Sequence, residues 1–83
     1  EPDEIIDNLD LKFQVQALYQ IINRVLTPRE KEIIYLRYGL LGREPKTQRE
    51  IAATMNISRS YVSRIEKKAL GKISAKMNSK RKP

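Results

Sequence analysis

The sequence of 83 residues contains no cysteine and no histidine. These absences exclude a disulfide framework, a thiol nucleophile, an imidazole base and a Cys/His metal site. The acidic residues near the N-terminus also lack the Asp/Asn/Gly spacing of a calcium-binding loop. We therefore expect that the protein is not an enzyme and that it binds neither a metal nor another cofactor.

Long hydrophobic runs are missing as well. No apolar segment approaches the roughly 18 residues of a membrane-spanning helix, and no signal peptide is visible. We therefore expect an intracellular protein without a membrane partner. The first residue is not methionine, which suggests a fragment. At this length we expect one domain with a modest core and no deep cleft for a small-molecule substrate.

Basic residues outnumber acidic residues, and they are unevenly distributed. The chain has 17 Lys and Arg against 10 Asp and Glu, a formal net charge of +7, which predicts a polyanionic partner. Residues 1–23 carry five acids and one base, whereas residues 46–83 carry eleven bases and two acids. The net charges of these segments are −4 and +9, so the positive field lies in the C-terminal half of the chain.

Within that half, the segment TQREIAATMNISRSYVSRIEKKAL, residues 47–70, predicts two short helices joined by a tight turn. Thr47 and Glu50 have the spacing of a capping box. Asn56 tolerates the left-handed conformation of a sharp helix end, and Ser58 can cap the second helix. The residues expected to face inward are Ile51, Ala52, Met55, Ile57, Val62, Ile65 and Ala69. Together these signals predict a helix-turn-helix.

The outward face of the second helix is polar and basic. Its residues are Arg59, Ser60, Tyr61, Ser63, Arg64, Lys67 and Lys68. They can reach the phosphates and base edges of duplex DNA, although an ordinary solvated face is the alternative. We expect further phosphate contacts where the first helix begins, because its free amides and positive dipole end attract anions. The residues there are Lys46, Thr47, Gln48 and Arg49.

Two more helices are expected before this motif. One runs from about Leu9 to Val25, and a short helical turn at residues 3–7 precedes it. Its apolar face consists of Phe13, Ala17, Leu18, Ile21, Ile22 and Val25. The next helix begins at Pro28 after the cap residue Thr27 and ends at Tyr38, before Gly39. The segment GLLGREPK, residues 39–46, is then a loop whose two leucines, Leu40 and Leu41, tuck against the core.

Strand-like alternation is absent from the sequence, so the predicted class is all-α. The expected architecture is a small domain of three to four helices with a C-terminal helix-turn-helix, a winged-helix-like DNA-binding superfold without a wing. We predict an acidic N-terminal segment at residues 1–8, the helix-turn-helix domain at residues 9–76 and a basic disordered tail at residues 77–83.

The segment from about Val25 to Ile73 resembles region 4 of bacterial sigma-70-type sigma factors. The resemblance consists of LTPREKEIIYLRYGL, a short Gly/Pro loop and the helix-turn-helix, in that order. The run SRSYVSRIE is more similar to sporulation sigma factors than to housekeeping ones. Two alternatives remain. LTPREKEII is also similar to response-regulator output domains, which however lack the GLLGREPK loop, and a basic protein-interaction module could bind an acidic partner.

The resemblance implies a promoter-recognition module that directs RNA polymerase core enzyme to the upstream (−35) element, in the bacterial cytoplasm and near the nucleoid. The base-reading positions that it implies are Arg59, Ser60, Tyr61, Ser63 and Arg64. Arg59 in the first helical turn can grip guanine bidentately. Lys68 aligns with a basic residue that faces the phosphate backbone, and Ser60 replaces an acidic residue of housekeeping members.

The same resemblance implies a second, protein-binding surface. Region 4 binds the flap-tip helix of the polymerase β subunit through an apolar concavity. The candidate residues in this chain are Ile33, Ile34, Leu36, Tyr38, Leu40 and Leu41. An anti-sigma factor that binds an overlapping surface is a further partner known in many members of the family.

Overall fold

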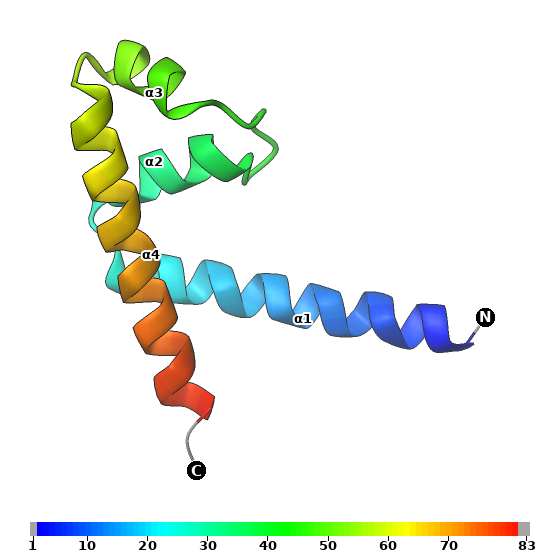
Figure 1. The fold of residues 1–83 in the computed structure, drawn as a ribbon. Helices are drawn as coiled ribbons and strands as arrows, with labels where there is room; N and C mark the ends of the chain where they lie inside the picture. Colours follow the sequence, from blue (N-terminus) through cyan, green and yellow to red (C-terminus); the bar gives the residue numbers. More distant parts are fainter. Residues whose placement is uncertain (1, 82–83) are drawn as a thin grey trace.

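The computed structural model describes residues 2–81 and, within them, the side chains of residues 14–79. Its helices are α1 (Pro2–Val25), α2 (Pro28–Tyr38), α3 (Gln48–Met55) and α4 (Arg59–Arg81). Helix α4 passes all the others: α3 and α2 lie beside its first half, and α1 meets its second half (Figure 1). The predicted all-α class and the C-terminal helix-turn-helix are confirmed.

Helix α2 begins and ends where its local sequence signals predict. The Thr27 hydroxyl accepts a hydrogen bond from the Glu30 amide at 3.2 Å, and the Glu30 carboxylate accepts one from the Thr27 amide at 2.9 Å. This reciprocal capping box is followed by Pro28 at the first helical position. At the other end, Gly39 adopts the left-handed conformation, with φ 65° and ψ 40°.

The helix-turn-helix is held by the predicted caps. Thr47 and Glu50 form a second capping box, with hydrogen bonds of 3.1 and 2.9 Å. Asn56 ends α3 in the left-handed conformation, with φ 57° and ψ 46°. The Ser58 hydroxyl then accepts a hydrogen bond from the Tyr61 amide at 3.1 Å, which caps the start of α4. These hydrogen bonds satisfy backbone amides that the helix starts would otherwise leave unpaired.

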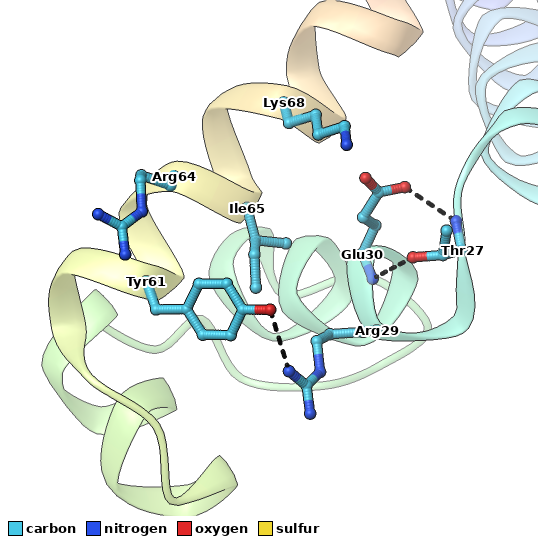
Figure 2. A pocket seen from close by; sticks show the side chains of 7 residues that line it. All are labelled: Thr27, Arg29, Glu30, Tyr61, Arg64, Ile65 and Lys68. Carbon is cyan, nitrogen blue, oxygen red and sulfur yellow. Dashed lines mark hydrogen bonds between the residues drawn. The ribbon is translucent and has the colours of Figure 1, made fainter.

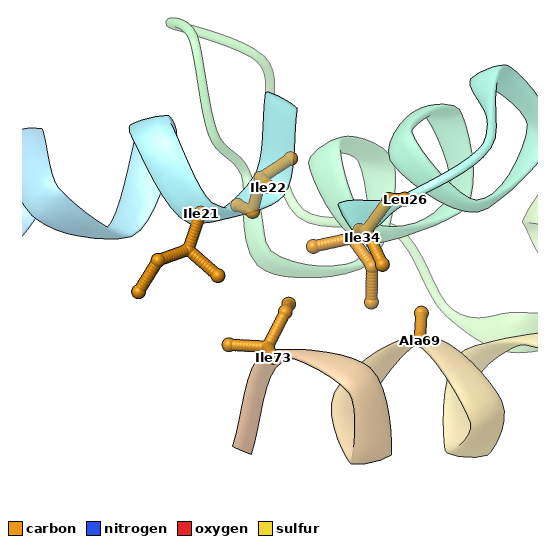
Figure 3. Packing of buried hydrophobic residues seen from close by; sticks show 6 residues of the cluster. All are labelled: Ile21, Ile22, Leu26, Ile34, Ala69 and Ile73. Atoms are coloured by element: carbon orange, nitrogen blue, oxygen red, sulfur yellow. The ribbon is translucent and has the colours of Figure 1, made fainter. Parts of the chain in front are cut away.

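Two buried clusters hold the helices together, and α4 contributes to both. The first joins α1, α2 and α4 through Ile21, Ile22, Leu26, Ile34, Ala69 and Ile73 (Figure 3). The second joins α2, α3 and α4 through Ile33, Leu36, Ile51, Ala52, Val62 and Ile65, with Met55 and Ile57 packed against it. A continuous α4 therefore couples the helix-turn-helix to the α1 side of the domain.

Helix α1 is longer than predicted. It begins at Pro2 rather than near Leu9, so the short turn expected at residues 3–7 is part of it. Proline at the first helical position and acidic residues after it form a normal helix start, a signal independent of the apolar periodicity. On the predicted apolar face, Ala17 is exposed, whereas Ile21 and Ile22 are buried. The side chain of Phe13 lies outside the described residues.

Helix α4 extends further than predicted, to Arg81. Residues 77–81 are thus helical where a disordered tail was expected, while the division of the chain into three segments stays a prediction. Gly71 costs a helix about 1 kcal/mol relative to alanine. Packing beyond it offsets this cost, since Ile73 is buried and Lys72 bonds the Glu30 carboxylate at 2.9 Å.

The loop between α2 and α3 folds back on its neighbours. The Lys46 amide donates to the Leu36 carbonyl at 2.8 Å, and the Leu41 amide donates to the Tyr19 hydroxyl at 3.1 Å. Leu40 packs against the first cluster as predicted. Leu41 was predicted to do the same, but it is 59% exposed because its left-handed φ of 58° turns the chain at this point.

Gly39, which follows α2, and Gly71, within α4, predict opposite effects of an added methyl group. At Gly39 a Cβ would lie 2.8 Å from Pro45 Cδ and 2.9 Å from the Arg43 carbonyl, and φ is positive. We expect Gly39→Ala to lower the free energy of unfolding by about 1–2 kcal/mol. Gly71→Ala, whose Cβ would meet nothing within 4 Å, should raise it by about 0.5–1 kcal/mol. Urea unfolding, followed by circular dichroism, measures both free energies of unfolding. Equal values for Gly39→Ala and Gly71→Ala would contradict the left-handed turn at Gly39.

Candidate nucleic-acid interface

The first two turns of α4 present the predicted DNA-contacting side chains to solvent. Val62 is 0% exposed and Ile65 is 9% exposed, so these two residues anchor the helix to α2 and α3. The residues predicted to read bases are all exposed: Arg59, Ser60, Tyr61, Ser63 and Arg64. Arg59 forms none of the ion pairs found among the described side chains. Base contact by these residues stays a prediction. Tyr61 is 39% exposed, and its hydroxyl accepts a hydrogen bond from Arg29 at 3.4 Å (Figure 2).

Two adjoining hollows lie where α3 meets α4. The larger, about 430 Å³, is lined by Arg37, Thr47, Gln48, Arg49 and Arg59. The smaller, about 270 Å³, is lined by Gln48, Arg59, Ser60 and Ser63. Both lie at the N-terminus of α3, where unpaired amides and the helix dipole favour an anion. The guanidinium groups of Arg49 and Arg59 add positive charge, whereas that of Arg37 is paired with Glu66, so the larger hollow suits a phosphate.

Arg37 also lines this hollow, although it was not among the predicted phosphate ligands. It belongs to α2, and its Nη1 donates to the Lys46 carbonyl at 3.4 Å, which brings it to the start of α3. Its only sequence signal is a basic residue in the last turn of α2. The predicted phosphate residue Lys46 is half-buried beside it, and Arg49 is exposed.

Gln48 has a different environment from the one predicted. Its side-chain amide donates to the Glu66 carboxylate at 2.8 Å. The side chain is therefore engaged within the protein, and only the backbone amide at the start of α3 remains for an anion. Lys67 and Lys68, the last two predicted phosphate ligands, are exposed on α4.

Glu66 joins three helices behind this face. It is 7% exposed and is the only acidic residue of α4. Its carboxylate accepts hydrogen bonds from the Tyr38 hydroxyl at 2.7 Å and from Gln48, and it lies 3.5 Å from Arg37 Nε. The hydrogen bond to Glu66 and burial raise the pKa of the Tyr38 phenol above its ordinary value. Glu66 therefore fixes the position of α4 relative to α2 and α3.

Glu30 plays a similar part at the other end of α2. It is 5% exposed, and its Oε1 accepts hydrogen bonds from Lys72 Nζ and from the Thr27 amide, each at 2.9 Å. Burial alone would raise the pKa of Glu30. The hydrogen bonds from Lys72 and Thr27 outweigh burial, and the pKa lies below its ordinary value of 4.5.

This lowered pKa predicts a loss of stability in acid. Because the unfolded chain binds the Glu30 proton first, the contribution of Glu30 is complete above pH 4.5 and is lost as the pH falls through the folded pKa. The free energy of unfolding should therefore decrease below about pH 4.5 in the native chain. Glu30→Gln should flatten this dependence, although Glu50, whose pKa is lowered by its bonds to Thr47, keeps part of it. If the free energy of unfolding fell equally with pH in the native chain and in Glu30→Gln, the lowered pKa of Glu30 would be contradicted.

An apolar hollow of about 330 Å³ lies on the α1 side of the domain. Its lining residues are Leu18, Ile22, Ile34, Tyr38, Leu40, Leu70 and Ile73. Of the predicted protein-contact residues, Ile34, Tyr38 and Leu40 line this hollow, and Leu41 is exposed outside its lining. Ile33 and Leu36 do not: they are 0% and 8% exposed in the second buried cluster, so core packing occupies them.

Leu18 and Leu70, which were not among the predicted contacts, also line the hollow. Leu70 is 40% exposed although it lies next to the buried Ala69. An exposed leucine on a helix is a weak signal by itself, because folded proteins expose many apolar atoms. Only the packing of α1 against α4 brings these side chains to one hollow.

No helix among residues 2–81 combines the length and the apolar character needed to cross a membrane. Among the described side chains, those of residues 14–79, there is no group of three or more metal-ligand residues. The surface features that remain are the basic hollows beside α4 and the apolar hollow.

Comparisons with known proteins place these features in a family. Residues 24–75, more than half of the chain, match the family described as "Sigma-70, region 4". RNA polymerase sigma-K factor of Bacillus subtilis (strain 168) is 49% identical over 73 residues, which cover 88% of this chain and 24% of that protein. RNA polymerase sigma-28 factor of Bacillus thuringiensis subsp. kurstaki is 48% identical over 73 residues, or 88% of this chain and 30% of that protein.

A third relative extends the comparison to another genus. RNA polymerase sigma-E factor of Clostridium acetobutylicum is 47% identical over 53 residues, which cover 64% of this chain and 23% of that protein. The chain thus spans about a quarter of the length of these relatives. The matched residues include α2, α3 and most of α4, the elements that form the basic hollows.

Proposed function

We propose that this chain, which belongs to the sigma-70 region 4 family, recognises the −35 element of bacterial promoters and helps to direct RNA polymerase core enzyme there. One observation carries the proposal: the predicted base-reading residues are all exposed on the first two turns of α4. Those turns are held in place by Val62 and Ile65. A helix presented in this way fits the major groove, which admits one α-helix.

In this arrangement α3 crosses the sugar-phosphate backbone. The hollow of about 430 Å³ at its N-terminus would take a phosphate beside the groove that α4 enters. If about four phosphates are neutralised, a plot of the logarithm of the DNA-binding constant against the logarithm of the salt concentration should have a slope of about −3.6. A domain this small binds weakly by itself, and its attachment to the rest of a sigma factor and to polymerase would raise its effective concentration at the promoter.

Residue differences on α4 predict a distinct base preference. Ser60 stands where housekeeping sigma factors have an acidic residue, and a hydroxyl is more permissive than a carboxylate, which prefers the cytosine amino group. The SRSYVSRIE run and the relatives named sigma-K and sigma-E support a parent protein of the sporulation type. We accordingly expect the protein in the bacterial cytoplasm, near the nucleoid.

Comparing the affinities of the chain for two polyanions tests whether it binds DNA in preference to an acidic polypeptide. We expect the chain to bind random-sequence duplex DNA more tightly than polyglutamate at the same charge concentration, because the spaced hollows beside α4 match phosphates rather than a flexible acidic chain. Equal affinities in fluorescence anisotropy would instead favour the basic protein-interaction module. The response-regulator alternative has no support in the matched family.

The apolar hollow is the surface that we propose for the flap-tip helix of the polymerase β subunit. Its open apolar lining fits the apolar face of a partner helix, as in other helix-in-groove complexes. Tyr38 and Leu40 line it and Leu41 lies exposed nearby in the chain, so these three remain the predicted contacts. An anti-sigma factor is a further occupant that we expect only from the family.

Two apolar residues of nearly equal exposure provide a matched test of this surface. Leu70 lines the hollow and is 40% exposed, whereas Val15 lies on α1 outside it and is 41% exposed. We expect Leu70→Gln to weaken binding of a β-flap fragment by about 1–2 kcal/mol, or roughly 5-fold to 30-fold, because the leucine is buried in the complex. DNA affinity should not change. Val15→Gln should leave both affinities unchanged; an equal loss in both variants would argue against the hollow.

A further inference from the structure

One buried carboxylate lies between the apolar hollow and the larger basic hollow. It belongs to Glu66, which is 7% exposed. Its Oε2 accepts a hydrogen bond from the Tyr38 hydroxyl at 2.7 Å, whereas its Oε1 accepts one from Gln48 at 2.8 Å and lies 3.5 Å from Arg37 Nε. Tyr38 lines the apolar hollow, and both Gln48 and Arg37 line the larger basic hollow. The carboxylate therefore contacts lining residues of both hollows.

The basic side of this network is incompletely bonded. Arg37 Nε is buried and has no hydrogen-bond partner among the described residues, although Glu66 Oε1 lies 3.5 Å away. Arg37 Nη1 donates to the Lys46 carbonyl at 3.4 Å, which is a long hydrogen bond. A buried donor without a partner costs free energy. A small shift of the guanidinium or of the carboxylate can therefore change how Glu66 divides its bonds between Arg37 and Gln48.

The apolar side of the network is open to water. Tyr38 is 46% exposed, so water competes with Glu66 for the Tyr38 hydroxyl while solvent reaches the apolar hollow. A helix seated in the hollow would cover the Tyr38 ring and exclude this water. A hydrogen bond is stronger where the local dielectric constant is lower. An occupied apolar hollow would therefore strengthen the bond between Tyr38 and Glu66.

An anion in the basic hollow would make the same bond more important. A phosphate there would share the Arg37 guanidinium with Glu66, because Arg37 lines the hollow. The buried carboxylate would lose part of the positive charge that stabilises it, so the Tyr38 hydroxyl would supply a larger share of its stabilisation. Each ligand thus favours the state in which Tyr38 is firmly bonded to Glu66, and each should favour binding of the other.

We propose that Glu66 is a positioning residue that couples the two hollows, so that a helix bound in the apolar hollow raises the affinity of the larger basic hollow for a DNA phosphate. By linkage, DNA raises the affinity for the helix by the same factor. This inference rests on the proposed function, in which the β-flap helix occupies one hollow and the DNA backbone contacts the other. The coupling lies within the domain and is separate from any effect of tethering on effective concentration.

DNA binding by the full chain, with and without a β-flap fragment, tests the coupling. Fluorescence anisotropy gives Kd for a labelled random-sequence duplex without the fragment and at a saturating fragment concentration, and the ratio of the two Kd values is the coupling factor. The fragment is not linked to the DNA, so effective concentration does not contribute. A titration of the duplex with the fragment alone shows whether these two bind each other.

Two variants interrupt the link, and a third provides the matched control. Tyr38→Phe keeps the ring in the apolar hollow and removes only the donor to Glu66. Glu66→Gln keeps the side-chain volume but replaces one acceptor oxygen with an amide donor, so it cannot accept hydrogen bonds from both sides. Tyr35→Phe removes a phenol hydroxyl from the same helix, outside the lining of both hollows.

In the native chain we expect the fragment to tighten DNA binding about threefold to tenfold. Tyr38→Phe and Glu66→Gln should each lower this factor to about 1, whereas Tyr35→Phe should keep the native value. Because the factor is a ratio, a change in either affinity alone does not alter it, and a purely structural role of Glu66 would leave it unchanged. The fragment Kd, measured with and without the duplex, should give the same factor.

Two results would overturn the inference while leaving the proposed function intact. One is a coupling factor of 1 in a native chain that binds both the fragment and the duplex. The other is a factor that Tyr38→Phe and Glu66→Gln leave unchanged, or that Tyr35→Phe lowers equally. Failure of the native chain to bind the fragment or the duplex would instead remove that part of the proposed function together with the inference. Urea unfolding shows whether each variant is folded.

Discussion

Replacing Arg59 with alanine is expected to abolish the preference of this chain for one DNA sequence over others. Arg59 is exposed in the first turn of α4, the end of a recognition helix that enters the groove. A guanidinium at that place can donate to guanine O6 and N7 together. Loss of such a pair costs about 1–3 kcal/mol, which is roughly a 5-fold to 150-fold loss of affinity for the preferred site.

Affinity measurements on a selected and a scrambled duplex would check this result. The ratio of the two affinities should fall toward 1 in Arg59→Ala, while the free energy of unfolding stays within about 0.5 kcal/mol of the native value, because the side chain is exposed. Lys67→Ala is a suitable control, since Lys67 is also exposed on α4 and is predicted to contact phosphate. It should weaken both duplexes equally. A ratio that Arg59→Ala leaves unchanged would assign base reading elsewhere.

The second large effect concerns stability: Glu66→Ala should destabilise the domain by about 1–3 kcal/mol. The variant removes the acceptor of the Tyr38 hydroxyl and of the Gln48 amide, and it leaves Arg37 without its carboxylate. These partners are partly exposed, so water can replace some of the lost bonds, but the buried part of each group retains the cost of desolvation. For a domain of this size, the loss is a large part of the total stability.

Urea unfolding of the native chain, Glu66→Ala and Glu66→Gln would measure this contribution. Glu66→Gln keeps the side-chain volume and one acceptor oxygen, so we expect a smaller loss than for alanine. The exposed neighbour Lys67 provides the control, because Lys67→Ala should change stability by no more than about 0.5 kcal/mol. If Glu66→Ala were as stable as that control, the three helices would not depend on this carboxylate.

Sequence signals were sufficient where the structure depends on neighbouring residues. The caps of α2 and α3 were predicted because each capping box needs only residues three positions apart, such as Thr47 and Glu50. The inner face of α4 was predicted because helical periodicity alone separates Val62 and Ile65 from the exposed arginines. Local chemistry thus gave the helix-turn-helix and the direction of its outer face.

Features that depend on distant residues were missed. Arg37, Glu66 and Gln48 meet only when α2, α3 and α4 are packed, and the partners Tyr38 and Glu66 are 28 residues apart. The end of α4 was left open, since the packing of Ile73 beyond Gly71 depends on α1 and α2 and has no local signal.

The apolar hollow shows the same limit. Periodicity identified apolar residues on α2, but it could not separate Ile33, which is fully buried, from Tyr38, which is 46% exposed. That difference arises because α3 covers one side of α2 and leaves the other side open toward α1 and α4. Exposure on a shared helix is therefore set by the neighbouring helices rather than by residue type.

The central claim is that the exposed turns of α4 read the sequence of duplex DNA. Selection of duplexes bound by the full chain from a random pool, followed by sequencing, tests it most directly. We predict that one short motif is enriched by the native chain and that Arg59→Ala, under the same conditions, enriches none. A native chain that binds the pool but returns it with no preferred sequence would contradict specific readout by α4.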